Sequence, residues 1–303
     1  MSITKIALIG ATGNIGHPIL QALLNDGSYE VTILSRQGST STDSLPTHPR
    51  QKITKVDFDD LNSLTAALQG IEGVVSNVAG HALLSQKKIV DAAVAAGVQR
   101  FLPSEFGSDL TVAVSAAVPF NQPKVEVRDY LELKAKEQPG FSYTSVCCGP
   151  FLDWCLKVGL FGDLKTREMT LWDGGETRVT TTTLASVGKA VAAIFKNLEA
   201  TKNRTVRIAD TTVTQKQLLG ILEELDGKKW TTKQGSTAEA YRAGLEEWKR
   251  PQPNMQVAIV NQLMRIIFSE EHSPDYADKL DNKVLGLPVM TEEQVKEVVK
   301  GCL

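Results

Sequence analysis

The chain has 303 residues, of which 42% are hydrophobic and 22% charged, and its 33 basic and 35 acidic side chains give a net charge of -2. This composition is typical of a globular protein with one large domain or two moderate ones. It argues against nucleic acid or an anionic membrane surface as a partner, because both favour a basic protein face.

Short apolar runs alternate with helical patterns over the first 150 residues. The run Lys5–Ile9 is typical of a buried strand, and apolar residues at helical spacing from Leu83 to Ala96 indicate a helix that Gly97 ends. In chain order we predict strand 5–9, helix 16–25, strand 29–34, loop 37–52, strand 53–58, helix 60–69, strand 73–78, helix 83–96, strand 100–103, helix 124–136 and strand 141–147.

The second half of the chain is less regular. It contains a helical pattern at 184–198, a strand pattern at 205–209, and further helical patterns at 214–225 and 292–300. The strand–helix alternation of the first half indicates repeated βαβ units, which form a parallel, doubly wound sheet. We therefore predict an α/β protein with a large domain over 1–150, rejoined by about 184–209, and a smaller lobe made mainly from 151–303.

The sharpest motif is a glycine-rich turn, GATGNIG at residues 10–16, between the first predicted strand and helix. This is the context in which such a turn binds a dinucleotide. Gly10 permits the tight turn, Gly13 lets the backbone approach the pyrophosphate, and Gly16 lets helix and strand pack closely. The positive end of the helix then faces the phosphates. The other turn residues that we expect at the cofactor are Thr12, Asn14 and Ile15.

The end of the second predicted strand indicates which dinucleotide binds. An NAD site has an acidic residue there, which accepts hydrogen bonds from the ribose 2′-hydroxyl. This strand instead ends Leu34-Ser35-Arg36, so a guanidinium stands where a 2′-phosphate would lie. We therefore predict NADP(H), with Ser35 and Arg36 beside the phosphate. The alternative is that Arg36 is a solvated loop residue.

Two further strand ends carry candidate cofactor contacts. After the third strand, the carboxylate of Asp57 is a candidate acceptor for the adenine amine and the ring of Phe58 a candidate to pack on its face. Aspartate at a strand end is also common in turns, so a purely structural role for Asp57 stays open. Val78 ends the fourth predicted strand, and this position at a strand end makes it a further candidate contact for the cofactor.

Several segments of the first 160 residues have specific sequences. They are GATGNIG at 10–16, QKKIVDAAVAAG at 86–97, RFLPSEFG at 100–107, Lys124-x-x-Val-Arg128 and FSYT at 141–144. Together they resemble the NmrA-like, isoflavone-reductase-like family of atypical short-chain dehydrogenases, and CGPFLDW at 148–154 is more similar to fungal members. The resemblance implies an NADP-binding Rossmann domain and a small C-terminal substrate lobe, with a cleft between them. It also implies NADPH-dependent reduction of small, often aromatic molecules.

The resemblance also implies a catalytic lysine early in the helix after the fifth strand, and this position is Lys124, which would also contact the cofactor. A lysine desolvated beside a cofactor has a pKa lowered toward neutrality, which suits it to proton transfer. Because Pro123 cannot lie deep inside a helix, we expect Lys124 in the first helical turn. The structural alternative is a surface lysine at a helix start.

Two other catalytic candidates lie nearby. Tyr130 and Lys134 have the Tyr-x-x-x-Lys spacing of ordinary short-chain dehydrogenases, but Tyr130 lies about 240° round the helix from Lys124, so both cannot face the cofactor. We prefer Lys124. Glu105 follows the fifth strand, where strand ends line the ligand crevice. It either orients Lys124 or a substrate hydroxyl, or is a structural carboxylate bound to backbone N–H groups.

Aromatic residues are candidates for the substrate pocket, although singly they are more often core. We predict Phe106, Phe151 and Trp154 for this role. We interpret Cys147 and Cys148 as buried thiols rather than nucleophiles, because no histidine is near them in sequence.

The cysteines lack C-x-x-C spacing, the four histidines lack metal-ligand spacing, and the first ten residues lack the apolar core of a secretory signal. We therefore expect a cytoplasmic protein, monomer or homodimer, with no metal and no membrane partner. The favoured function is an NADPH-dependent reductase of a small molecule, with Lys124 as acid/base. Two alternatives stay open, a non-catalytic NADP-sensing regulator and an NADP-bound enzyme of a non-redox step.

Overall fold

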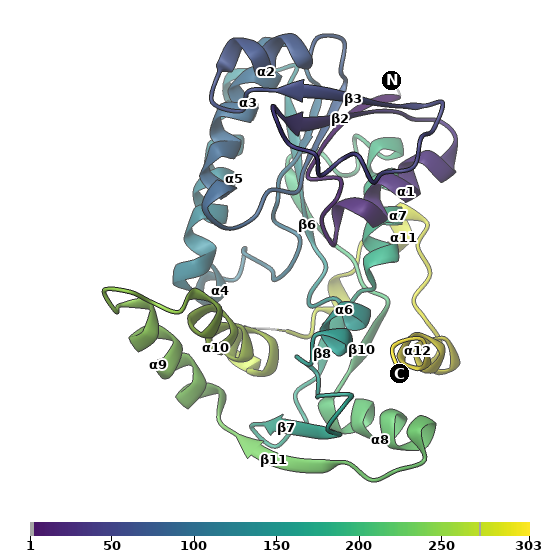
Figure 1. Ribbon diagram of the computed structural model, residues 1–303, viewed down its shortest axis with the longest axis vertical. Helices are drawn as coiled ribbons and strands as arrows, with labels where there is room; N and C mark the ends of the chain where they lie inside the picture. The colour runs from purple at the N-terminus through teal and green to yellow at the C-terminus, as the bar shows by residue number, and fades with distance from the viewer. Residues whose placement is uncertain (1–2, 273) are drawn as a thin grey trace.

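A seven-stranded parallel sheet forms the centre of the computed structural model, which describes residues 3–272 and 274–303 (Figure 1). Its strand order is β3-β2-β1-β4-β5-β6-β9, and the order reverses between β1 and β4. In such a sheet the ligand crevice lies at this reversal, outside the carboxyl ends of the strands. The strands are β1 Lys5–Ile9, β2 Glu30–Arg36, β3 Gln51–Val56, β4 Gly73–Ser76, β5 Arg100–Leu102, β6 Ser142–Cys147 and β9 Arg204–Arg207.

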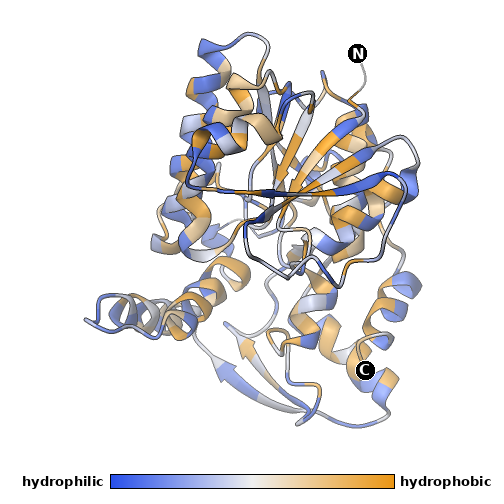
Figure 2. Cartoon of the chain, turned by 45° about the horizontal axis from the view of Figure 1, so that its top comes forward, coloured by the Kyte–Doolittle hydropathy of each residue, from blue (hydrophilic) through white to orange (hydrophobic). Residues whose placement is uncertain are grey.

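Helices cover both faces of this sheet because its strands are apolar on both sides. In β1, Ile6 and Leu8 pack against one helix layer, whereas Ala7 and Ile9 pack against the other. Figure 2 shows the same pattern, with largely hydrophobic central strands and helices whose outer faces carry hydrophilic residues. One layer holds α1 (Gly16–Asp26) and α7 (Leu184–Lys196), and the other holds α2 (Leu61–Ala67), α3 (Gln86–Ala95) and α5 (Gln122–Glu137).

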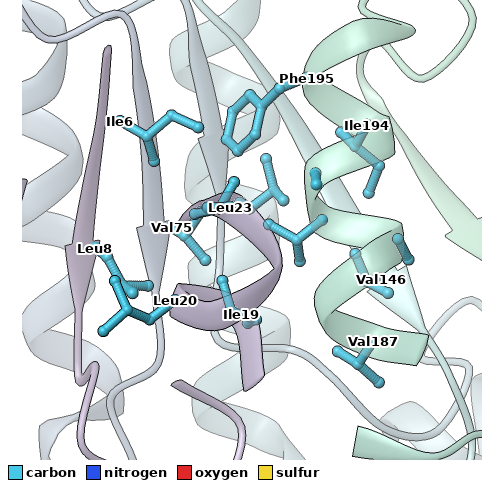
Figure 3. Close-up of a cluster of buried hydrophobic side chains, with 14 of the residues drawn as sticks. Ile6, Leu8, Ile19, Leu20, Leu23, Val75, Val146, Val187, Ile194 and Phe195 are labelled. Atoms are coloured by element: carbon cyan, nitrogen blue, oxygen red, sulfur yellow. The ribbon is translucent and has the colours of Figure 1, made fainter. Parts of the chain in front are cut away.

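Helix α7 brings the later chain back onto the first domain. Its apolar face meets α1 in a cluster that includes Ile19, Leu23 and Phe195 (Figure 3). The two helices approach closely at Gly188, where a Cβ would lie 2.4 Å from the carbonyl oxygen of Pro18. After α7, strand β9 pairs in parallel with β6 and completes the sheet.

Most of the remaining elements build a second apolar core beside the carboxyl ends of the sheet (Figure 1), whereas α11 packs on α7 through Leu285. Strands β7 and β11 pair in parallel, β8 and β10 pair antiparallel, and α9 packs along α10. The elements are α6 Leu152–Lys157, β7 Glu168–Trp172, β8 Val179–Thr181, β10 Thr211–Val213, α8 Gln215–Asp226, β11 Thr231–Gly235, α9 Thr237–Trp248, α10 Met255–Phe268, α11 Asn282–Leu285 and α12 Glu292–Lys300. Among the short helices, η1 Gly80–Ser85, α4 Ala113–Ala116 and η2 Pro119–Asn121 lie between elements of the sheet domain, and η3 Glu270–His272 and η4 Ala277–Lys279 lie between α10 and α11.

The predicted α/β, doubly wound class is confirmed, and the predicted strand 5–9 agrees with β1 at both ends. Most of the other predicted boundaries differ by one or two residues, and two of the differences have a clear local cause. Strand β3 occupies 51–56 rather than 53–58, because Asp57 begins a turn into α2. Helix α3 begins at 86 rather than 83, since residues 80–85 form the tighter helix η1. Within the described residues, the helices are too short or too polar to cross a membrane, and His, Cys, Asp and Glu form no metal-binding group of three.

Buried Arg100 holds the returning segment against the sheet. It is 2% exposed, and its guanidinium donates to Ser142 and Thr144 on β6, to Thr201, and to the carbonyl of Leu198 after α7, at 2.7–2.9 Å. Burial lowers the pKa of Arg100 to about 10. Arg100→Leu should lower the free energy of unfolding by about 3 kcal/mol, because buried acceptors lose their donors. Urea unfolding tests this value, and an unchanged midpoint would contradict it.

Candidate active site

The glycine turn between β1 and α1 is shaped by close backbone contacts. Gly10 has φ +76°, and a Cβ on it would lie 2.6 Å from the carbonyl oxygen of Asn77. A Cβ on Gly16 would lie 1.9 Å from the carbonyl oxygen of Gly10, so the helix can start here only with glycine. Gly13 differs, because it is exposed and its Cβ would meet only that same oxygen, at 3.4 Å. The space over Gly13 is therefore open to a ligand.

The neighbouring turn residues divide between solvent and core. Thr12 and Asn14 are exposed, whereas Ile15 is half-buried against the apolar cluster of α1 and α7. The amide of Gly13 donates to the carbonyl of Gly10 at 3.1 Å, which tightens the turn. The exposed residues Thr12, Gly13 and Asn14 therefore lie where a pyrophosphate would approach the start of α1.

A pocket of about 330 Å³ extends from this turn across the end of β2. Ile33, Leu34 and Phe58 give it apolar walls, and Arg36 lines it together with Ser39, Ser41 and Thr42 of the loop that follows β2. The lining residues are Ile9, Gly10, Ala11, Thr12, Ile33, Leu34, Ser35, Arg36, Ser39, Ser41, Thr42, Phe58, Asn77, Val78, Ala82 and Ser85. The structure thereby brings the predicted Ser35, Arg36, Phe58 and Val78 to one cavity.

Asp57 lies outside this pocket. Its side chain is exposed and accepts the amide of Asp59 at 2.9 Å, while its own amide donates to the hydroxyl of Ser63 at 3.0 Å. These bonds form the turn into α2, which is the structural alternative for Asp57 that the sequence left open. The contact predicted between this carboxylate and adenine therefore has no support in the structure.

Lys55 and Asn77 lie at this site but were not predicted. Lys55 Nζ donates to the hydroxyl of Ser35 at 3.3 Å, to that of Thr42 at 3.4 Å, and to the carbonyl of Ser39. Lys55 thus holds the pocket loop and adds a second cation near Arg36. Its position on β3, in register with Ser35 on β2, is the signal that could have found it.

Glu105 and Lys124 meet beyond the end of β5. Lys124 lies in the first turn of α5 directly after Pro123, as predicted, and its Nζ donates to the backbone carbonyl of Glu105 at 3.4 Å. Burial lowers the pKa of Lys124, although the nearby Glu105 carboxylate opposes this shift. An ammonium that is easier to deprotonate is suited to proton transfer.

The Glu105 side chain itself is 3% exposed and accepts a hydrogen bond from the hydroxyl of Ser145 at 2.8 Å. Burial raises the pKa of Glu105, against the lowering effect of that bond and of the Arg128 and Lys124 charges. The Glu105 carboxyl is therefore held inside the protein by Ser145, while Lys124 contacts the backbone carbonyl of the same residue.

The competing Tyr130 and Lys134 pair is oriented toward α3. The Tyr130 hydroxyl donates to Asp91 at 2.5 Å, and Lys134 lies 3.2 Å from the same carboxylate and 5.1 Å from the centre of the Tyr130 ring. Burial and the bond to Asp91 raise the pKa of Tyr130. This pair therefore forms a contact between helices α5 and α3. Neither Tyr130 nor Lys134 takes part in the contact between Lys124 and Glu105.

The three predicted substrate residues do not line the pocket at the glycine turn. Phe106 is 6% exposed and belongs to the core cluster under α1 and α7. Phe151 is half-buried against that cluster, and Trp154 against the core of the second lobe. Cys147 and Cys148 are buried free thiols, as interpreted, and burial raises the pKa of Cys148 to about 12.

Comparisons with known proteins agree on one family. Residues 2–284 match the model of the NmrA-like family. The chain is 34% identical over 306 residues to the oxidoreductase aprR of Aspergillus flavus, covering 98% of this chain and 99% of that protein. It is 31% identical over 275 residues to pinoresinol reductase 1 of Arabidopsis thaliana, covering 82% of each.

Solved structures of reductases share the fold over nearly the whole chain. AtPrR2 with NADP+ and (+)pinoresinol superposes with a TM-score of 0.82 at 23% identity, covering 100% of both chains. The leucoanthocyanidin reductase–NADPH complex from Vitis vinifera superposes with a TM-score of 0.76 at 21% identity, covering 97% and 99%. The chain therefore belongs to the NmrA-like family, as its segments GATGNIG and RFLPSEFG indicated, and has the fold of NADP(H)-bound reductases.

Proposed function

We propose that this protein is an NADP-dependent oxidoreductase that reduces a small, aromatic or secondary-metabolite molecule, with Lys124 as the acid/base. The observation that carries the proposal is the arrangement at one edge of the sheet, where a pocket with Arg36 adjoins an open glycine turn and the half-buried Lys124 lies beyond β5. The names of the relatives, an oxidoreductase and a pinoresinol reductase, support the same reaction class.

The residues of the pocket fit NADP(H). Gly13 leaves open space at the start of α1, apolar walls suit an adenine ring, and Arg36 with Lys55 supplies positive charge for a 2′-phosphate. When bound, the cofactor supplies a hydride for the reduction. We assign its binding to residues 1–150 together with 184–209, and substrate binding mainly to the rest of 151–303.

Lys124 and Glu105 have different parts in this proposal. Because burial lowers its pKa, Lys124 can give a proton to a substrate oxygen and be reprotonated afterwards. Glu105 is a positioning residue, since its carboxyl is held by Ser145 while its backbone carbonyl accepts from Lys124. The half-buried Phe151 and Trp154, at the start of the second lobe, stay candidates for the substrate contact, as does the more deeply buried Phe106.

The reaction class is tested by NADPH consumption with a panel of phenolic, enone and aldehyde substrates. We expect absorbance at the NADPH band to fall with at least one class, and a reduced product to form. If the protein binds NADPH but consumes none with any of them, the regulator or the non-redox enzyme becomes the better account. A partner pull-down with and without NADP then separates these two.

Arg36 is expected to set the choice between cofactors. A charge-assisted hydrogen bond contributes about 1.5–3 kcal/mol, or roughly 10- to 150-fold in affinity. Arg36→Ala should weaken NADPH binding by about that factor and leave NADH binding nearly unchanged, as measured by titration. Lys52→Ala is the matched control, because Lys52 is an exposed cation on β3 that does not line the pocket. Equal weakening of both cofactors by Arg36→Ala would exclude the 2′-phosphate contact.

A further inference from the structure

A second cavity, of about 610 Å³, lies at the β9 edge of the sheet. Three arginines line it, Arg128 from α5 and Arg204 and Arg207 from β9. This cavity shares no lining residue with the pocket at the glycine turn. The proposed function therefore gives these three guanidinium groups no role.

A single turn after β5 holds two of these arginines. Arg207 donates to the carboxylate of Asp109 at 2.7 Å and to the hydroxyl of Thr111 at 2.9 Å. The carbonyl of Leu110, between them, accepts from Arg128 at 2.6 Å. Asp109 also accepts the amide and the hydroxyl of Thr111, at 2.9 Å and 2.6 Å, which fixes the turn. Two side chains from distant parts of the sequence are thereby held at one cavity.

Arg128 and Arg207 keep unused N–H donors, whereas Arg204 is almost fully paired. A guanidinium carries five N–H groups. Among the described residues, Arg204 uses four of them, on the carboxylate of Asp281 and on two backbone carbonyls. Arg207 uses two and Arg128 only one. The Arg207 and Arg128 side chains are nevertheless largely withdrawn from solvent, at 22% and 15% exposed.

The carboxylates that pair with Arg207 and Arg204 do not line the cavity. Burial raises the pKa of Asp109, but hydrogen bonds from Thr111 and Arg207 outweigh this effect and lower that pKa. Asp109 is therefore ionised and orients the Arg207 guanidinium, and Asp281 does the same for Arg204 at 2.8 Å. A guanidinium that is already held in place loses little freedom when it binds a ligand.

Arg128 and Glu132 determine the charge inside the cavity. Arg128 has a weak ion-pair partner, since the carboxylate of Asp129 is 3.9 Å away and 66% exposed. The Glu132 carboxylate lines the cavity and accepts the hydroxyl of Tyr143 at 3.3 Å. The cavity thus has a cationic side, formed by Arg128 and Arg207, and one opposing carboxylate.

We propose that this cavity binds a small oxyanion, a carboxylate or a phosphate group, between Arg128 and Arg207. Guanidinium N–H groups match the oxygens of both kinds of anion with charge-assisted hydrogen bonds. The site goes beyond the proposed function, because it needs no cofactor and lies outside the dinucleotide pocket. The bound anion joins β9 to α5, the helix that carries Lys124, and so stabilises the folded protein.

Calorimetric titration of the whole protein with inorganic phosphate and with succinate tests this site, with sodium chloride at equal ionic strength as the reference. We expect one of the two probes to bind, and the stronger one identifies the preferred anion. Arg128→Gln should weaken its binding roughly 10-fold, because charged donors are lost. Glu132→Gln should strengthen it about two- to five-fold, because the opposing charge is removed. Arg242→Gln removes an exposed arginine of α9 outside the cavity and should change nothing.

Ala113→Glu keeps the test decisive if Arg128→Gln does not fold. Ala113 is exposed and lines the cavity, so glutamate there adds an opposing charge with little effect on stability. It should weaken binding about two- to five-fold.

Phosphate binding beside Arg36, in the dinucleotide pocket, is the competing explanation. Loss of phosphate binding in Arg36→Ala, together with wild-type affinity in Ala113→Glu and Glu132→Gln, would overturn the proposal. A wild-type protein that binds neither probe at millimolar concentration would overturn it as well. Neither result affects the NADPH titrations that test the proposed function, so the two proposals fail separately.

Discussion

Replacing Lys124 with alanine is expected to lower kcat roughly 10²- to 10⁴-fold, the usual contribution of a general acid or base. The affinity for NADPH should fall little, because the glycine turn and Arg36 form a separate part of the site. The physical reason is that Lys124 is half-buried, has a lowered pKa and lies beyond β5 at the ligand edge of the sheet. Steady-state kinetics on the substrate found in the panel measures kcat, and NADPH titration measures affinity.

Two further variants make this prediction specific. Tyr130→Phe should change kcat less than about tenfold, since its hydroxyl is bonded to Asp91 on α3. Lys136→Ala removes another lysine from the last turn of the same helix and controls for the loss of charge. If Tyr130→Phe loses activity while Lys124→Ala keeps it, the ordinary Tyr-x-x-x-Lys mechanism operates. If neither changes the rate of product formation, the non-redox reaction gains support and Glu105 becomes the next residue to test.

The sequence was most informative where structure and function depend on neighbouring residues. The turn at 10–16 combines strand, glycines and helix in one segment, so Gly10 and Gly16 could be assigned their packing roles before the structure was known. Arg36 was found because it immediately ends a strand whose position in the sheet follows from the βαβ order. Pro123 likewise fixed Lys124 in the first turn of α5.

The parts of the site that were missed depend on register between strands. Lys55 and Asn77 each end up beside the pocket because β3 and β4 run next to β2 and β1, and a shift of one residue would point their side chains the other way. Phe58 and Asp57 illustrate the same limit, since adjacent residues at one strand end divide between the pocket and a turn. No local pattern determines that division.

The second lobe was predicted poorly for a related reason. Its strands β7 and β11 pair across a long intervening stretch of chain, and β11 (TTKQG) has no apolar residue that could mark it as a strand. Helices α9 and α10 did carry local signals, because Ser236 and Asn254 cap their first turns by accepting backbone amides. These capping residues could have located both helices.

Gly13→Val is expected to abolish binding of NADPH and of NADH while the protein stays folded. Valine at this exposed position meets only the carbonyl oxygen of Gly10, at 3.4 Å from its Cβ, so the turn can accommodate it. The added side chain then occupies the open space through which a pyrophosphate would approach the start of α1. Titration with both cofactors measures binding, and circular dichroism with thermal unfolding checks the fold.

Gly16→Val is the contrasting variant, because the two glycines differ in what surrounds them. Its Cβ would lie 1.9 Å from the carbonyl oxygen of Gly10 and 2.9 Å from the Cα of Ala11, both backbone atoms that cannot move aside cheaply. This variant should therefore lose stability as well as binding, whereas Gly13→Val should lose binding alone. If Gly13→Val binds NADPH at wild-type strength, the turn has only a structural role, and the cofactor pocket must be sought elsewhere. We expect Gly13→Val to lose binding of both cofactors and Arg36→Ala to lose binding of NADPH alone. These two results together would assign the pyrophosphate to the glycine turn and the 2′-phosphate to Arg36, as two separate parts of one site.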